Sequence, residues 1–205
     1  MKLPVDTLVR LIRQCLTHFP GQHKLVFPED PALMPAAVLV PLIERPNAMT
    51  ILLTIRSQHL HHHPGQISFP GGGVEADDPD VASAALREAQ EELGIPPAYV
   101  EVIGCLDTYQ TITGFIITPV VGLIKPGFEL VLDPFEVAEV FEIPLALALD
   151  ASNYQRQRIT YNDKRRCYYL LPYAGYEIWG ATAGILMNFA KKMSTYKQFC
   201  DLYCA

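Results

Sequence analysis

The sequence lacks several features that would place the protein in well-known classes. Its five cysteines are an odd number and include no C-x-x-C pair, which argues against a disulfide framework or zinc ribbon and favours a reducing, cytoplasmic setting. No uncharged stretch of apolar residues reaches the roughly 18 residues that a membrane span needs, and charges interrupt the apolar residues near the N-terminus. We therefore expect neither a membrane anchor nor a secretory signal. Internal repeats and low-complexity segments are also missing.

Positive charge is scarce as well. Sixteen Lys and Arg residues stand against 22 Asp and Glu residues, for a net charge of −6, which argues against a nucleic-acid binder held by a broad basic surface. The negative excess is local, because residues 71–95 hold seven acidic residues and one basic residue, Arg87, whereas the rest of the chain sums to zero. The charge pattern thus points to this segment.

What is present indicates one globular domain over residues 1–205. Half of the chain is hydrophobic and 19% is charged, and the length is sufficient for a sizeable core. Strands and helices alternate, which predicts a mixed α/β or α+β sandwich. The segment 57–80 reads as a loop too long to be without function. We expect a docked amphipathic N-terminal helix within residues 1–22, strands at 36–43, 50–56, 99–106, 115–124, 137–141, 155–160 and 167–171, a helix at 81–93, and C-terminal helices within 178–203, starting with one at 178–192.

The predicted helix at 81–93 carries an acidic face. Helical spacing places Glu88, Glu91 and Glu92 on one arc, where like charges cost about 0.2–0.5 kcal/mol per pair. A hard divalent cation would turn this repulsion into binding, and oxygen-only ligands favour Mg²⁺, Mn²⁺ or Ca²⁺ over zinc. The alternative is a solvated helix face on which Arg87 bridges Glu91.

Three glycines precede this helix and favour close approach of the backbone to a ligand. After Gly71–Gly73, the chain from Arg87 to Ile95 reads R-E-A-Q-E-E-L-G-I, which resembles the Nudix box, R-E-U-x-E-E-x-G-U, where U is aliphatic or small. The first half of the box departs from the pattern, because matching its acidic position to Asp78 requires one inserted residue.

A second motif resembles one subfamily. Residues 52–57, L-L-T-I-R-S, and 65–72, G-Q-I-S-F-P-G-G, look like the extra motif of coenzyme A pyrophosphatases of the Nudix superfamily, whose boxes also carry the inserted residue. Arg56 matches the first arginine of that motif, and His61 stands where a second arginine is usual. Residues 178–182 are similar to the tail of the subfamily. The resemblance implies a Nudix-type α/β/α sandwich with a mixed β-sheet between helices.

The resemblance also implies an activity, namely Mg²⁺- or Mn²⁺-dependent hydrolysis of coenzyme A, or a derivative, to 4′-phosphopantetheine and adenosine 3′,5′-bisphosphate. Under this hypothesis Glu88, Glu92 and Glu91 bind metal, and Glu88, Glu91 and Arg87 form the catalytic set, in which Arg87 orients a glutamate. The substrate contacts would be Arg56, His61, Gly71 and Gly72. The base that accepts the proton of the attacking water is left open between Glu88 and a residue from a loop outside the box.

Several alternatives stay open at this point. The substrate is a small molecule, not a nucleic acid or a membrane, but it could be ADP-ribose, a dinucleoside polyphosphate or a nucleoside triphosphate, and a non-catalytic ligand-sensing module is the non-enzymatic alternative. The histidines at 59 and 61–63 are either a transition-metal cluster or a polar loop near the substrate. Lys164, Arg165 and Arg166 either meet the 3′-phosphate of coenzyme A or form a solvated hairpin turn. The N-terminal helix either docks on its own chain or pairs two subunits in a homodimer.

Overall fold

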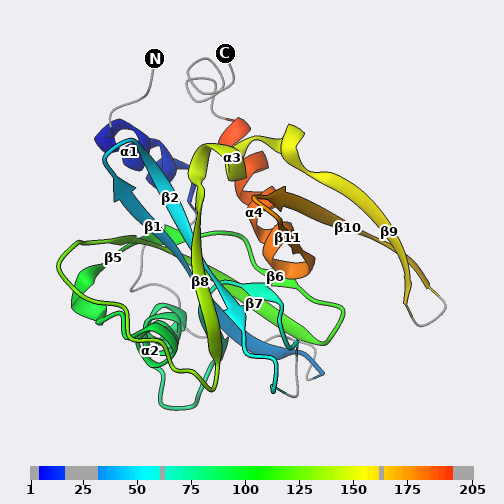
Figure 1. The fold of residues 1–205 in the computed structure, drawn as a ribbon, viewed down its shortest axis with the longest axis horizontal. Helices are drawn as coiled ribbons and strands as arrows, with labels where there is room; N and C mark the ends of the chain where they lie inside the picture. The colour runs from blue at the N-terminus through cyan, green and yellow to red at the C-terminus, as the bar shows by residue number, and fades with distance from the viewer. Residues whose placement is uncertain (1–4, 17–31, 61–62, 162–163, 196–205) are drawn as a thin grey trace.

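The structure, a computed structural model, describes residues 5–16, 32–60, 63–161 and 164–195 (Figure 1). The helices are α1 (Val5–Cys15), α2 (Val81–Leu93), α3 (Leu145–Leu149) and α4 (Gly180–Ser194), and short 3₁₀ turns lie at Pro97–Tyr99 and Ala151–Asn153. The strands are β1 (Met34–Arg45), β2 (Ala48–Arg56), β3 (Ile67–Ser68), β4 (Gly71–Gly73), β5 (Val100–Cys105), β6 (Tyr109–Gln110), β7 (Phe115–Ile124), β8 (Val137–Pro144), β9 (Gln155–Tyr161), β10 (Lys164–Tyr173) and β11 (Tyr176–Trp179).

A large mixed sheet forms the centre of the molecule. Its main order is β3-β2-β1-β7-β5, with β4 paired to β1, β6 to β7 and β8 to β2. β1 and β7 run parallel over ten residue pairs, whereas the other pairings of this sheet are antiparallel. A second, three-stranded antiparallel sheet, β11-β10-β9, lies beside α4 (Figure 1).

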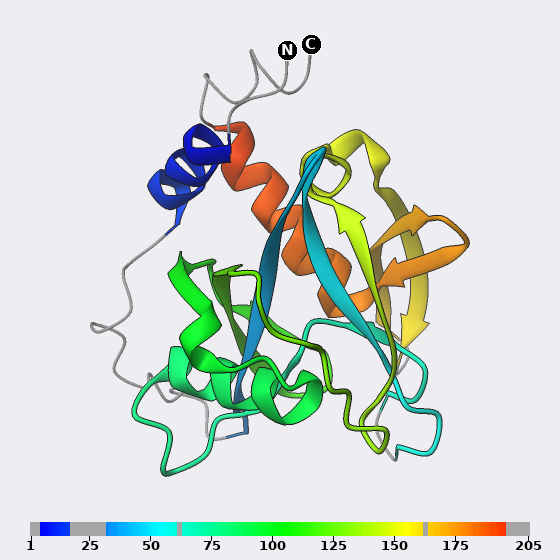
Figure 2. The same cartoon turned by 60° about the vertical axis from the view of Figure 1, so that its left-hand side comes forward.

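Helices cover both faces of the central sheet. Successive side chains of a strand point to opposite sides, and apolar side chains on both sides need to be covered. On β1, Leu39 packs in a cluster with α2, whereas Val40 packs in the opposite cluster with α1, α3 and α4. Figure 2 shows the sheet between α2 and α4. The predicted α/β/α sandwich with a mixed sheet is confirmed.

Local signals set the ends of α2 where the sequence predicts them. The Asp80 side chain accepts a hydrogen bond from the Ser83 N–H at 2.7 Å and caps the start of the helix. Gly94 ends it in a left-handed conformation, with φ of 67°. Small buried residues on one face, among them Ala85 and Ala89, bring the helix close to the sheet.

Three expectations about secondary structure were wrong in part. The segment 57–80 is not entirely a loop, because β4 pairs with β1 and β3 pairs with β2. The helix expected from residue 178 begins at Gly180, since Ile178 and Trp179 pair with β10 as part of β11. Residues 164–166 lie in β10 and do not form the turn.

The terminal helices lie within their expected ranges. In α1, the apolar residues Leu8, Leu11 and Ile12 are buried in the core of the chain itself. The remainder of the expected N-terminal helical range after Leu16, and residues 196–203, lie outside the described residues. Among the described residues, no helix combines the length and apolar character that crossing a membrane would require.

Candidate active site

Arg87 connects the glycine-rich loop to the acidic face of α2. Its guanidinium donates two hydrogen bonds to the carboxylate of Asp78, both at 3.1 Å, and one to the carbonyl oxygen of Gly73 at 3.1 Å. It also donates to Glu88 and Glu91 at 3.0 Å each. These bonds lower the pKa of Asp78, and together with burial they leave its carboxylate committed to Arg87. Asp78 thus holds the loop on the helix.

Glu88 lies against the backbone of β4. A Cβ atom built on Gly72 would come within 2.5 Å of Glu88 Oε1, so only glycine leaves room for the carboxylate at this place. The Glu88 side chain is 14% exposed. Burial raises its pKa, and the neighbouring Arg87 opposes that rise. The carboxylate is therefore partly desolvated and fixed in position.

Glu92 is the most deeply buried acid of the cluster. Its side chain is 3% exposed, and its nearest cation is Arg56, with 3.8 Å between Arg56 Nη1 and Glu92 Oε1. Burial raises the pKa of Glu92 to about 8, although Arg56 and the backbone N–H of Gly71 lower it. The single cation at 3.8 Å does not offset the burial of this carboxylate, and a bound metal ion would relieve the remaining penalty.

Glu136 joins this cluster from a distant part of the sequence. It lies just before β8, and its negative charge raises the pKa of both Glu88 and Glu92. Two hydrogen bonds hold its loop at the end of β2, one from the Ser57 N–H to the Glu136 carbonyl oxygen and one from Ser57 Oγ to the Pro134 carbonyl oxygen, both at 2.9 Å. Sequence reasoning did not find Glu136, because nothing in its local sequence distinguishes it from Glu129 or Glu139.

An exposed aromatic residue flanks the cluster. Phe135 precedes Glu136, is 72% exposed, and contacts the ring of His59 edge to face at 6.0 Å between centroids. The Phe135 N–H donates to the Asp133 carboxylate at 2.9 Å, which fixes the loop beneath the ring. Planar or apolar parts of a ligand would find a surface here.

The structure brings together most of the residues predicted for the site. Glu88, Glu92, Arg56, Gly71 and Gly72 meet where α2, β2 and β4 converge. Glu91 also contacts Arg87 but its side chain is 59% exposed, so it lies on the outer edge. His61 and His62 lie outside the described residues.

The donor set fits a hard divalent cation. Glu88, Glu92 and Glu136 offer oxygen ligands, and the Glu88 carboxylate lies directly over the backbone of Gly72. Within the described ranges, no group of three or more His, Cys, Asp or Glu side chains is arranged so that it could hold a metal ion by itself. An incomplete protein set is what Mg²⁺ commonly has, because it keeps waters and substrate phosphates as its other ligands.

Comparison with known proteins identifies the family of this chain. The NUDIX domain family matches residues 33–162, more than half of the chain. A protein of Salmonella newport described as "Uncharacterized Nudix hydrolase NudL" is 43% identical over 182 residues, which cover 87% of this chain and 94% of the relative. A protein of the same description from Enterobacter sp. is 46% identical over 155 residues, 76% of this chain and 80% of the relative.

The fold is also shared with a solved structure. The MutT protein from Methanosarcina mazei superimposes with a TM-score of 0.51 at 17% identity, covering 84% of this chain and 97% of that protein. At 17% identity this structural match shows only a shared fold, whereas the relatives with 43% and 46% identity show the family. The chain belongs to the Nudix hydrolase family, and it is an enzyme that hydrolyses phosphorus-containing anhydrides.

Proposed function

We propose that this enzyme hydrolyses the diphosphate bond of coenzyme A, or of a coenzyme A derivative, in a reaction dependent on Mg²⁺ or Mn²⁺. The observation that carries the proposal is the meeting of Glu88, Glu92 and Arg56 at the backbone of Gly71 and Gly72. Arg56, Gly71 and Gly72 belong to the sequence motif that resembles coenzyme A pyrophosphatases, whereas the glutamates belong to the Nudix box. The two motifs therefore supply one site.

The acidic residues hold the metal and the basic residue holds the substrate. Glu88 and Glu92 are the first ligands, and Glu91 takes part through Arg87 or through water. A divalent cation at these oxygens would neutralise charge on the diphosphate and lower the pKa of a bound water. Arg56, 24% exposed and beside Glu92, binds a phosphate oxygen, and the backbone at Gly71 and Gly72 allows the diphosphate to approach.

Arg87 acts as a positioning residue. All five of its hydrogen bonds go to Asp78, Gly73, Glu88 and Glu91, so its guanidinium is engaged by the protein. It holds the Glu88 carboxylate in place over the backbone of Gly72. His61 stays a predicted phosphate contact of lower charge than the arginine it replaces.

Two residues compete for the role of general base. Glu88 is fixed by Arg87, whereas Glu136 makes none of the side-chain ion pairs found among the described residues and comes from a loop outside the box. Either carboxylate would accept the proton of the attacking water at one of its oxygens. Because Glu136 lies outside the Arg87 network that fixes Glu88, we assign Glu136 as the base and Glu88 as a metal ligand.

The test is product analysis after incubation of the purified protein with divalent metal and a panel of coenzyme A, ADP-ribose, diadenosine polyphosphates and nucleoside triphosphates. We expect coenzyme A to give 4′-phosphopantetheine and adenosine 3′,5′-bisphosphate. The Glu88→Gln variant, prepared identically, controls for a contaminating hydrolase. Cleavage of ADP-ribose with coenzyme A left intact would overturn the choice of substrate while leaving the reaction class in place. A cytoplasmic location and a homodimer stay predictions.

A further inference from the structure

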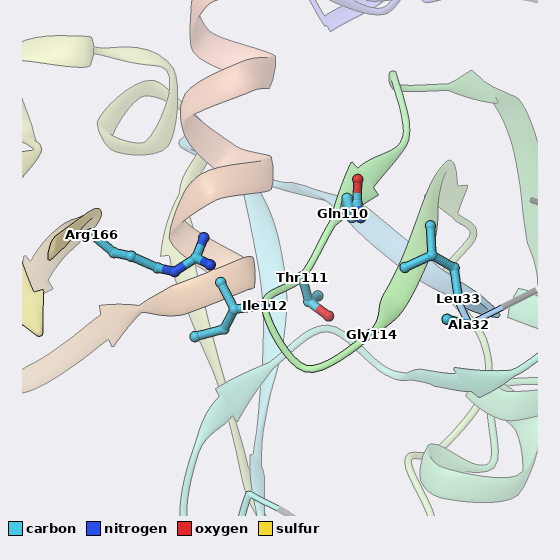
Figure 3. A pocket seen from close by; sticks show the side chains of 7 residues that line it. All are labelled: Ala32, Leu33, Gln110, Thr111, Ile112, Gly114 and Arg166. Atoms are coloured by element: carbon cyan, nitrogen blue, oxygen red, sulfur yellow. The ribbon is translucent and has the colours of Figure 1, made fainter. Parts of the chain in front are cut away.

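A ligand-sized space lies away from the carboxylate cluster. It is an open cavity of about 480 Å³, within the size range of small-molecule sites. The segment just before β1, the end of β6 with the β6–β7 turn, and β10 form its walls (Figure 3). The lining residues are Ala32, Leu33, Gln110, Thr111, Ile112, Gly114 and Arg166, none of which belongs to the cluster described above.

Arg166 gives this cavity its charge. Figure 3 shows its side chain extending from β10 toward the β6–β7 turn, and it is the one ionisable residue of the lining. Within the part of the chain that the structure describes, no carboxylate lies within ion-pair distance of it. β9 and β10 together carry four arginines and one lysine but no acidic residue, whereas the rest of the chain has a net charge of −11. The cavity edge is thus a local positive region on an acidic protein.

The other walls suit the sugar or base that accompanies a phosphate. The Thr111 hydroxyl is engaged within its own turn, with Phe115 and Thr113, so Gln110 and Arg166 are the side chains placed to donate to a ligand. Ile112, 53% exposed, and Leu33 supply apolar surface. A guanidinium beside an amide and an apolar wall fits a phosphate ester on a nucleoside.

β1 connects this cavity to the glycine loop. Ala36 pairs with Gly73 of β4, and Leu33 lies three residues before Ala36 on the same chain. Gly72 and Gly71, which receive the diphosphate, pair with Ala37 and Val38, so at about 3.3 Å per residue the cavity wall is roughly 13–17 Å along the strand from them. A substrate held at Gly71–Gly72 could therefore reach the cavity with its nucleoside end.

We propose that this cavity is a second anion subsite, in which Arg166 binds a phosphate ester of the substrate that is not part of the hydrolysed diphosphate. The inference rests on the proposed function, because coenzyme A carries such a group on its ribose. It assigns the selection of the nucleotide end of the substrate to β10 and the β6–β7 turn, outside both sequence motifs.

Arg165 provides a matched control for Arg166. The two residues are neighbours on β10, and both are exposed. Arg166 pairs with Ile159 and Arg165 pairs with Thr160, so their side chains leave the hairpin on opposite faces. Arg166→Gln and Arg165→Gln therefore remove the same charge from the same strand, but only the first removes it from the cavity.

Binding is measured by calorimetry, with divalent metal present, using adenosine 3′,5′-bisphosphate and adenosine 5′-monophosphate as probes. We expect the unmodified protein to prefer the bisphosphate, Arg166→Gln to weaken its binding 10- to 100-fold, and Arg165→Gln to change it less than threefold. Equal weakening by the two variants, or no preference for the bisphosphate in the unmodified protein, would overturn the proposal.

Kinetics separate this inference from the proposed function. With coenzyme A, Arg166→Gln should raise KM about tenfold or more and leave kcat nearly unchanged, whereas with dephospho-coenzyme A the same variant should behave like the unmodified enzyme. Failure of the unmodified enzyme to cleave coenzyme A would contradict the proposed function, and the binding comparison would still decide the subsite.

Discussion

The carboxylate of Glu88 rests on the backbone of Gly72, and a single added methyl group at residue 72 would collide with it at 2.5 Å from Oε1. The neighbouring glycine differs, because a Cβ atom at Gly73 would meet nothing within 4 Å. Two adjacent glycines of one short strand therefore have different roles, and the requirement for glycine at 72 comes from the acidic helix.

Gly72→Ala should lower metal-dependent turnover at least tenfold, because Glu88 must leave its position over β4. Gly73→Ala is the matched control and should retain most of the activity. The measurement is kcat at saturating metal for both variants, with circular dichroism to establish that each is folded. Equal activities in the two variants would show that the position of Glu88 over Gly72 is unimportant for the reaction.

Glu88→Gln should reduce metal-dependent turnover 100-fold or more, since the substitution removes the charge but keeps the shape of a metal ligand. Glu75→Gln serves for comparison, because Glu75 is 68% exposed and lies 3.9 Å from the Arg87 guanidinium. Its loss should alter kcat less than threefold. A folded Glu88→Gln enzyme with nearly normal kcat would remove Glu88 from the mechanism.

Glu136→Gln tests the residue that the fold adds to the cluster. If Glu136 accepts the proton of the attacking water, kcat should fall 100-fold or more, while the metal concentration needed for half-maximal activity changes much less. The exposed Glu129 of the same connection, changed to Gln, should leave both quantities unaltered. Loss of metal affinity with little loss of kcat would instead make Glu136 a metal ligand.

Burial of Glu92 predicts an unusual pH dependence for the metal-free protein. The folded state raises the pKa of Glu92 from its ordinary value near 4.5 to about 8, so between these values the folded state binds more protons than the unfolded state. The Glu92 contribution therefore favours folding at low pH and is lost as the pH rises toward 8, by a few kcal/mol in all.

Urea unfolding at pH 5.5 and pH 8, with a chelator present, measures this effect. The unmodified protein should lose stability over this interval, and Glu92→Gln should remove most of the loss. Glu91→Gln, one residue away with a side chain that is 59% exposed, should leave the pH dependence intact. An identical pH dependence in unmodified protein and Glu92→Gln would mean that Glu92 does not carry this proton.

The sequence predicted the features that rest on local signals. The bounds of α2 follow from Asp80 and Gly94, and β7 follows from a continuous apolar run, so both were predicted to the residue. β4 was missed because three glycines have no strand preference of their own, and it forms only where β1 offers backbone partners. β11 was missed because Ile178 and Trp179 precede a helix without a break in apolar character.

The candidate site shows the same division. The glutamates of α2 and Arg56 could be named from their motifs. Glu136 lies 44 residues after Glu92, and its place in the cluster depends on how the chain folds back onto β2. Two hydrogen bonds from Ser57 hold the loop that carries Glu136 against the end of β2, and no sequence pattern predicts either bond. The face of the hairpin on which Arg166 lies could be assigned only from the pairing of β10 with β9 in the structure.

The turn between β4 and α2 explains how this chain tolerates one more residue than the usual box. The Glu75 N–H donates a hydrogen bond to the Asp78 carboxylate at 2.8 Å, and Arg87 donates to the same carboxylate. The extra residue is therefore accommodated in a closed turn, whose tip, Ala76 and Asp77, is exposed. The length of this loop therefore does not change where the glutamates of α2 lie. A short peptide tag or fluorophore attached between Ala76 and Asp77 would sit beside the proposed active site without displacing its residues, which makes this turn a suitable attachment point for a reporter of substrate binding.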